Sequence, residues 1–242
     1  MQPFEREFEV RGYEAGPARM VEPYRLAEWF QDAAARHARL LGFSMERLWD
    51  EGYAWVLARA LFRMNALPEA GEVLTVHTWP SGVDKYYCYR DAVFTRADGS
   101  ELARIGSAWV ALDMKARRMT SVPDWLAAGL PEGSTREIEF DCRNLPKLDA
   151  PQVATDVVTR LDDLDSNGHV NNAKYMAWVL APFGSEDAPG ELASLDIMFR
   201  AEARAGESLV SDCAREEDGA WLHRITRVSD GRELIRARSR WR

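Results

Sequence analysis

The strongest constraint on the fold of this chain is that its sequence repeats. Segments 98–104 and 230–236 share the frame D-G-x-E-L-x-R, and a tryptophan follows each at the same distance, Trp109 and Trp241. The offset is constant, because 230 − 98 and 241 − 109 both equal 132. Upstream, an F-R pair precedes a G-E pair in both copies. This shared order predicts two copies of one structural unit, each about half of the chain.

Each copy predicts one long helix followed by strands. After Pro23, apolar side chains recur at the spacing of an amphipathic helix that Gly42 ends, and a shorter pattern follows Asn172. Asp-Gly turns at 98–99 and 230–231 join neighbouring strands as antiparallel hairpins. The expected fold class is α+β, with each antiparallel sheet wrapped around its helix. The expected strands are 55–64, 73–79, 86–95, 102–112, 195–200, 208–213, 221–228 and 233–241, and the helix positions are Leu26, Trp29, Phe30, Ala33, Ala34, His37, Leu40 and Leu41, then Tyr175, Trp178, Val179 and Phe183.

The copies define the expected domains. Residues 1–128 form the N-terminal unit and residues 151–242 the C-terminal unit, while segment 129–150 carries Gly, Pro and mixed charge and connects them.

The composition narrows the functional classes. A net charge of −8 opposes general nucleic-acid binding, which needs a broad basic surface. Three scattered cysteines without a CxxC pair predict neither a disulfide framework nor a zinc site, and we expect no metal or other cofactor. The charged, alternating N-terminus does not resemble a signal peptide, and no apolar run approaches the roughly 18 residues of a membrane span. We therefore expect a cytoplasmic protein.

The stretch 163–175, D-L-D-S-N-G-H-V-N-N-A-K-Y, concentrates the chemistry. It places carboxylates, carboxamides and one histidine directly before a helix. Such a loop can present a base, an amide dipole and a helix N-terminus to one point in space, which are the parts needed to polarise a carbonyl and activate a water.

Two other interpretations compete for this loop. Its opening matches a calcium-binding EF-hand loop, but Lys174 stands at the twelfth position, where a bidentate Glu is required. Asp, Asn and Gly also form turns and helix caps without any catalytic role. Against that simple role, the approach to the first helix has no Asn or His, so only one copy carries the polar set. His37, His77 and His223 lie within apolar or alternating segments and are expected to be structural.

With these residues in view, the chain resembles the acyl-acyl-carrier-protein (acyl-ACP) thioesterases of plants and bacteria. The resemblance depends on the motif from Asp165 to Trp178, D-S-N-G-H-V-N-N-A-K-Y-M-A-W. Shorter matches along nearly the whole chain support it, namely V-R-G-Y at 10–13, G-P-A-R at 16–19, W-P-S-G at 79–82, R-D at 90–91, W-V at 109–110 and R-R-M at 117–119. The family has a tandem hotdog fold, so the resemblance implies a double hotdog.

The resemblance also implies a catalytic set. Asp165, Asn167 and His169 match the family's motif, and Glu202 matches a Glu that the family places on the following strand. The family often has a Cys after that Glu, whereas this chain has Ala203, which makes a cysteine nucleophile implausible. Backbone N–H groups of Val170, Asn171 and Asn172, at the start of the helix, would face the thioester oxygen. The N-terminal half would hold the acyl chain, and the positions expected to set chain length are Trp29, Phe30, Ala33 and His37, whose simpler role is core packing.

The expected activity is hydrolysis of a fatty acyl thioester on acyl carrier protein in fatty acid biosynthesis, with the phosphopantetheine-linked chain as substrate. Glu202 would act as general base on water or attack directly, and these two routes stay open. An acyl-CoA thioesterase and a non-catalytic acyl-binding module are the alternatives, and a homodimer is a further expectation. A row of guanidiniums on the last strand is a candidate docking face for the acidic carrier, although a solvated sheet face is the simpler interpretation; the row is Arg236, Arg238, Arg240 and Arg242.

Overall fold

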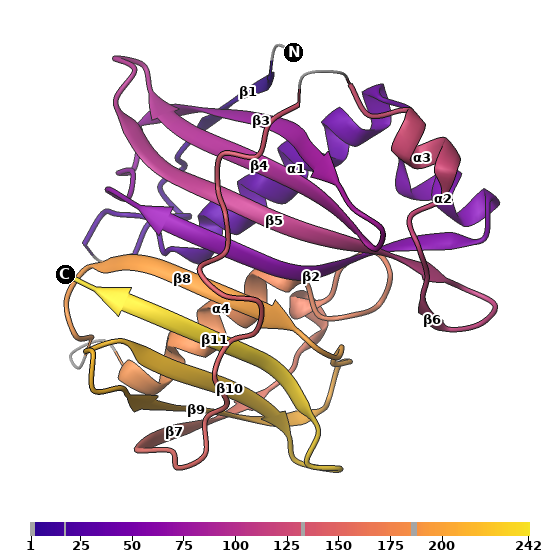
Figure 1. Cartoon of the computed structure of the whole chain (residues 1–242). Coiled ribbons are helices and arrows are strands. Elements are labelled where there is room, and N and C mark those ends of the chain that lie inside the picture. Colours follow the sequence, from indigo (N-terminus) through magenta and orange to yellow (C-terminus); the bar gives the residue numbers. More distant parts are fainter. Residues whose placement is uncertain (1–2, 17, 132–133, 185–187) are drawn as a thin grey trace. The chain divides into compact units, whose positions relative to one another are not determined.

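The computed structural model describes residues 3–16, 18–131, 134–184 and 188–242 (Figure 1). The chain divides into two compact units, Met1–Glu139 and Phe140–Arg242. The division falls inside the segment that the sequence predicts to connect the two copies.

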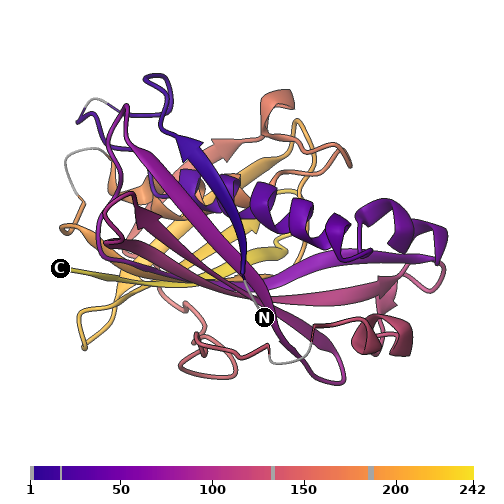
Figure 2. The same ribbon diagram turned by 90° about the horizontal axis from the view of Figure 1, so that it is seen from above.

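The first unit is one antiparallel sheet with three helices among its described residues. Its strands lie in the order β1-β3-β4-β5-β2, and a short β6 pairs with β5. The long helix α1 packs against β1 and β3, as Figure 2 shows. The bounds are β1 Phe4–Glu9, α1 Tyr24–Leu40, α2 Met45–Asp50, β2 Tyr53–Met64, β3 Val73–Val83, β4 Tyr87–Arg96, β5 Glu101–Asp113, β6 Arg118–Met119 and α3 Asp124–Ala128.

The second unit repeats this plan. Its strands lie in the order β7-β9-β10-β11-β8, and helix α4 packs against β9 and β10. Strand by strand this is the order of the first unit, which confirms the predicted duplication. The bounds are β7 Val153–Val158, η1 Leu161–Asp163, α4 Asn172–Leu180, η2 Ala181–Phe183, β8 Leu192–Phe199, β9 Ser208–Arg215, β10 Trp221–Arg227 and β11 Glu233–Trp241.

The duplication extends to individual hydrogen bonds. Trp109 Nε1 donates to Ser107 Oγ over 2.9 Å, and Trp241 Nε1 donates to Ser239 Oγ over 2.8 Å. The Arg of each D-G-x-E-L-x-R frame likewise bonds the Glu three residues before it, with Nε–Oε distances of 2.8 Å in both copies. The repeated letters therefore specify repeated contacts at the edge of each hairpin.

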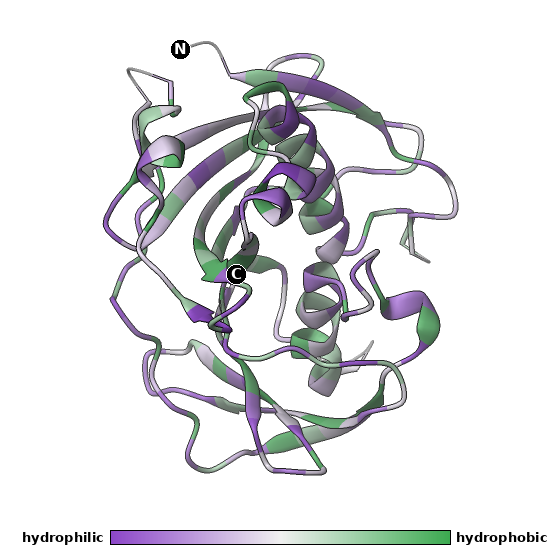
Figure 3. Cartoon of the chain, turned by 90° about the vertical axis from the view of Figure 1, so that its right-hand side faces the viewer, coloured by the Kyte–Doolittle hydropathy of each residue, from purple (hydrophilic) through white to green (hydrophobic). Residues whose placement is uncertain are grey.

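Helix α1 forms where the apolar spacing predicts it. Of its expected apolar face, six positions are buried, whereas Leu40 is 73% exposed, so the prediction for Leu40 is wrong. Leu40 is the last residue of the helix, three positions after His37, the last buried one. The buried positions are Leu26, Trp29, Phe30, Ala33, Ala34 and His37. The mixture of hydrophilic and hydrophobic residues along the strands is visible in Figure 3 and is typical of sheets with one covered face.

Two features of the fold differ from expectation. A strand precedes the long helix in each unit, because β1 and β7 pair with β3 and β9 at one edge of their sheets. The second helix pattern also ends earlier than its apolar residues indicate. Pro182 cannot continue the α-helical hydrogen bonds, so Phe183 lies in the 3-10 turn η2, although it remains buried.

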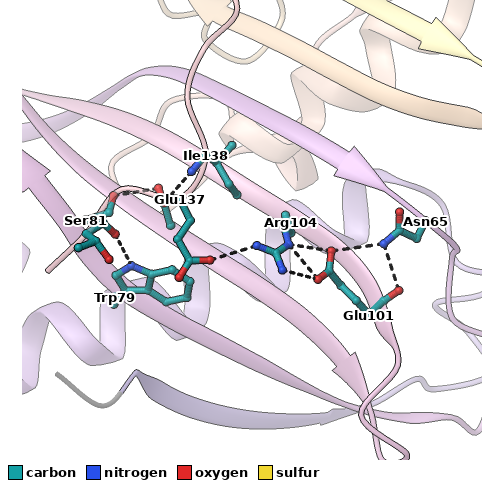
Figure 4. A network of polar contacts seen from close by, with 9 residues as sticks. Asn65, Trp79, Ser81, Glu101, Arg104, Glu137 and Ile138 are labelled. Carbon is teal, nitrogen blue, oxygen red and sulfur yellow. Dashed lines mark hydrogen bonds and ion pairs between the residues drawn. The ribbon is translucent and has the colours of Figure 1, made fainter.

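The connecting segment is pinned to the sheets. In the first unit, Trp79 Nε1 donates to the carbonyl of Thr135 over 3.0 Å, and Arg104 Nη1 bonds Glu137 over 3.1 Å (Figure 4). Ile138 packs on Gly106, where an added Cβ would lie 2.8 Å from the Ile138 side chain. In the second unit, Arg236 Nη1 donates to the carbonyl of Leu145 over 3.1 Å. The equivalent arginines of the two copies therefore each hold part of this segment.

A candidate active site at the start of helix α4

Asp165 organises the loop that precedes α4. Its Oδ1 accepts hydrogen bonds from the backbone N–H of Asn167 (2.8 Å) and of His169 (3.3 Å), while its own N–H donates to the His169 carbonyl over 2.8 Å. Gly168 adopts a φ of 75°, a left-handed conformation that glycine takes without strain. The D-S-N-G-H sequence is thus a closed Asx-type turn that ends by presenting His169.

Asn167 belongs to this turn. Its side-chain Nδ2 donates to Asp165 Oδ2 over 3.4 Å. In the described part of the chain, its side chain bonds the Asp165 carboxylate and not Glu202.

His169 and Glu202 meet, as the resemblance implies. The imidazole Nε2 lies 3.3 Å from the carboxylate Oε2. Glu202 does not lie on a strand as expected, because β8 ends at Phe199 and Glu202 follows in the irregular segment before β9. The His169 side chain is 32% exposed and that of Glu202 is 58% exposed, so water reaches both groups. A carboxylate and an imidazole in contact can share the work of taking up and returning a proton.

The three amides proposed to face the thioester oxygen are not equally available. Val170 N–H donates to the Ala203 carbonyl over 3.0 Å, and Asn171 N–H donates to the Asp163 carbonyl over 2.8 Å. The prediction is therefore wrong for these two groups, since each already has a protein acceptor.

Asn172 differs from its neighbours in the first turn of α4. The Asn171 side chain caps the helix by accepting from Ala173 N–H over 2.9 Å, and Lys174 N–H donates to the Asn171 carbonyl. Among the described residues, Asn172 N–H is the one amide of this turn to which no protein acceptor is assigned. Of the three backbone donors predicted from the sequence, the Asn172 N–H is the one that remains available to the thioester oxygen.

Lys174 has a structural role in the loop. Its Nζ lies 3.5 Å from Asp163 Oδ1, so the cation at the twelfth position of the EF-hand-like sequence pairs with the carboxylate of the first. Within the described ranges, no group of three His, Cys, Asp or Glu residues could hold a metal ion.

Two of the three thiols are buried, which suppresses their reactivity. Burial raises the pKa of Cys88 to about 12 and that of Cys213 to about 12, which keeps both protonated at neutral pH. Cys142 is exposed in the connecting segment, where its Sγ bonds the Asn144 carbonyl. At Ala203, which follows Glu202, the side chain is fully buried.

The expected chain-binding residues lie together on the buried face of α1. Trp29 packs near Phe8, and the ring of His37 stacks on Phe4 with centroids 5.3 Å apart. Arg90, which belongs to the R-D match at 90–91 but was given no role there, donates from Nη1 to His37 Nδ1 over 3.2 Å. Burial, together with Arg90, lowers the pKa of His37 to about 4, so this imidazole is neutral at pH 7.

The guanidinium row on β11 is not a free cationic face. Arg238 pairs with Glu216 over 2.6 Å and with Asp218 over 2.8 Å, and Arg240 shares Asp218. The remaining two also have carboxylate partners, since Arg236 pairs with Glu233 and Arg242 with Glu191. This neutralisation removes the basis on which the row was expected to dock an acidic carrier.

Sequence reasoning missed two side chains next to Glu202. Tyr175 was counted only as an apolar helix position, yet its hydroxyl accepts from Ala203 N–H over 2.7 Å. Arg227, in β10, donates to the Glu202 carbonyl. The tyrosine falls within the motif that ends at Trp178, which is the one sequence signal that marks it; nothing marks Arg227.

Both halves of the chain match models of known protein families. The family model of the acyl-ACP thioesterase N-terminal domain matches residues 1–130, and that of the C-terminal domain matches residues 147–242. The chain is 30% identical to a chloroplastic acyl-[acyl-carrier-protein] hydrolase of Cuphea viscosissima over 99% of its own length and 62% of that protein. It is 28% identical to a chloroplastic palmitoyl-acyl carrier protein thioesterase of Arabidopsis thaliana, covering 98% of this chain and 63% of that protein. The chain thus spans less than two thirds of the length of these relatives.

Solved structures agree with the fold. The 12:0-ACP thioesterase from Umbellularia californica superposes with a TM-score of 0.86 at 25% identity, covering 99% of this chain and 96% of that one. An acyl-ACP thioesterase from Bacteroides thetaiotaomicron superposes with a TM-score of 0.85 at 20% identity, covering 97% and 96%. The architecture is the tandem hotdog fold. Of the helices in the described ranges, none combines the length and apolarity that a membrane span requires.

Proposed function

Because the chain belongs to the acyl-ACP thioesterase family, we propose that it hydrolyses the thioester of a fatty acyl chain on acyl carrier protein and releases a free fatty acid and the carrier thiol. The observation that supports this most is the contact of 3.3 Å between His169 Nε2 and Glu202 Oε2 beside the start of α4. A carboxylate base in contact with His169, and a helix-terminal amide three residues after that histidine, suit attack of water on a carbonyl.

In the proposed reaction Glu202 is the general base. More than half of its side chain is exposed, and a hydrated carboxylate is better suited to activating water than to attacking a carbonyl itself. The carboxylate takes a proton from water, and the hydroxide oxygen bonds the carbonyl carbon. The carbon–sulfur bond then breaks, and the proton passes to the departing thiolate. His169, in contact with the same carboxylate, orients it and stabilises the protonated state.

The negative charge that develops on the thioester oxygen needs a donor. Asn172 N–H fits this role, because it opens α4 and the helix dipole favours negative charge at this end. One such donor is typically worth about 3 kcal/mol of transition-state stabilisation. Asp165 fixes the turn that carries His169, and Asn167 strengthens that turn through its bond to Asp165.

We assign the acyl chain to the N-terminal half, as the family resemblance implies. The buried face of α1 carries Trp29, Phe30, Ala33 and His37, and enlarging Ala33 is expected to shorten the preferred chain. The cytoplasmic location and the homodimer stay predictions.

A thiol-release assay tests the proposal. The purified chain is given palmitoyl, oleoyl and dodecanoyl groups, each attached to acyl carrier protein and, in parallel, to CoA. Faster release from carrier protein at equal concentration supports the proposal. Release from CoA alone would make the chain an acyl-CoA thioesterase, and binding of lipid without thiol release would make it a binding module.

A further inference from the structure

Glu202 lies in an irregular segment, and the contacts that fix this segment determine where its carboxylate lies. Residues 200–204 lie between β8 and β9 and belong to no strand. The N–H groups of Arg200 and Ala201 still bond the Leu234 carbonyl of β11, over 2.8 and 3.3 Å, but Glu202 and Ala203 lie beyond these bonds. The carboxylate nevertheless has to stay in contact with an imidazole that belongs to another loop. Whatever holds this segment therefore controls the geometry of the proposed base.

The peptide group between Glu202 and Ala203 is held on both sides by side chains. Its carbonyl accepts a hydrogen bond from Arg227 Nη2, and its N–H donates to Tyr175 Oη over 2.7 Å. The next carbonyl, that of Ala203, accepts from Val170 N–H over 3.0 Å, which ties the same segment to the residue after His169. These bonds fix the plane from which the Glu202 side chain projects.

Both clamping side chains are themselves fixed. Tyr175 is 2% exposed, and its ring makes edge contacts with Trp178 and Phe199 at centroid distances of 5.4 and 6.2 Å. Burial raises the pKa of its hydroxyl, so the phenol stays neutral. Arg227 is anchored by Glu207 and by Asp230, each at 3.2 Å.

Tyr175 also links the candidate oxyanion donor to the proposed base. It lies in the first turns of α4, the helix whose first amide, Asn172 N–H, is the candidate oxyanion donor. Through the bond to Ala203, the same helix sets the position of the base. Catalysis by such a pair depends on alignment, and a displacement of about 1 Å can cost about a hundredfold in rate.

We propose that Tyr175 and Arg227 are positioning residues that clamp the Glu202–Ala203 peptide and so hold the Glu202 carboxylate against His169. This inference rests on the proposed function only for its kinetic consequence. The position of the Glu202 carboxylate, which the clamp sets, can be tested whether or not the chain hydrolyses thioesters.

The test compares Tyr175→Phe with Thr159→Val. The first removes one phenolic oxygen from the clamp. The second is a control on a neighbouring contact of the same segment. The buried Thr159 Oγ1 donates to the Arg204 carbonyl over 2.6 Å and accepts from the Glu207 N–H over 2.9 Å, without touching the Glu202 peptide. Two readouts are taken on folded protein: kcat and KM with palmitoyl-acyl carrier protein, and the NMR signal of the His169 ring, assigned with His169→Ala.

The clamp predicts that Tyr175→Phe moves the His169 ring signal toward its position in Glu202→Gln and lowers kcat at least about tenfold at unchanged KM. Thr159→Val keeps both readouts near wild type. If Tyr175→Phe does not fold, Arg227→Met takes its place with the same expectations. A His169 signal left at its wild-type position overturns the clamp, as does an equal shift in the control. If the wild-type chain releases no thiol while the signal moves as expected, the proposed function fails and the clamp stands.

Discussion

His169 Nε2 lies 3.3 Å from Glu202 Oε2, although the two residues come from different loops on either side of α4 and β8. A backbone bond that no sequence motif displays, from Val170 N–H to the Ala203 carbonyl, joins the two loops. The contact between His169 and Glu202 brings a partly exposed carboxylate, an imidazole and the first amide of a helix into one region of the C-terminal unit.

The cysteines are expected to be dispensable. Replacing Cys88, Cys142 and Cys213 with Ala one at a time should keep kcat within about twofold of wild type. Cys88 and Cys213 are buried thiols with raised pKa values, which supply no thiolate at neutral pH, and Cys142 belongs to the connecting segment and not to the loops that carry His169 and Glu202. The measurement is turnover per folded protein. Loss of turnover at constant folded fraction in any of the three would revive a thiol mechanism.

Acid is expected to destabilise the fold through buried histidines. Burial lowers the pKa of His37 to about 4 and that of His223 to about 3, against an ordinary 6.5. Below pH 6.5 the unfolded chain therefore binds protons that the folded chain does not, so the stability these groups contribute at neutral pH is lost as pH falls toward 4. Between pH 7.5 and 5 the loss should be about 1–2 kcal/mol per histidine. Urea unfolding at both pH values should show a smaller loss in His37→Gln, and an unchanged loss would contradict the assignment.

The connecting segment should be sensitive at Gly106. In Gly106→Ala the new Cβ would lie 2.8 Å from the Ile138 side chain and 3.1 Å from its carbonyl oxygen, contacts that require the pinned segment to shift. We expect the free energy of unfolding to fall by about 1–3 kcal/mol. Gly12→Ala is the control, because an added Cβ there meets nothing within 4 Å. Equal free energies of unfolding for the two variants would show that the connecting segment around Ile138 can shift without cost, which would contradict the prediction.

We expect the arginine row on β11 to make no contribution to binding of acyl carrier protein. Arg240 is half exposed and already shares Asp218 with Arg238, so Arg240→Ala should leave KM for acyl carrier protein unchanged and cost less than about 1 kcal/mol in stability. Steady-state kinetics with carrier-bound substrate check this. A KM that rises severalfold would restore the row as a docking face.

Local patterns predict most of the architecture and part of the site. The constant offset predicts the duplication, and the strand Glu233–Trp241 has the bounds that its alternation indicates. Local spacing also predicts that His169 stands before a helix. The availability of Val170 and Asn171 could not be predicted, because their N–H groups are taken by carbonyls whose approach only the tertiary fold determines. The same holds for Arg227, whose role comes from a contact with a distant loop.

The pairing of His169 with Glu202 is tested most directly by the rate of thiol release from palmitoyl-acyl carrier protein by the wild type, Glu202→Gln and His169→Ala. Glu202→Gln keeps the shape of the side chain but cannot take up a proton. We expect kcat to fall by about 10²–10⁴-fold in each variant with KM little changed, because both groups act on the transition state. Wild-type turnover in either variant, with the protein folded, would contradict it.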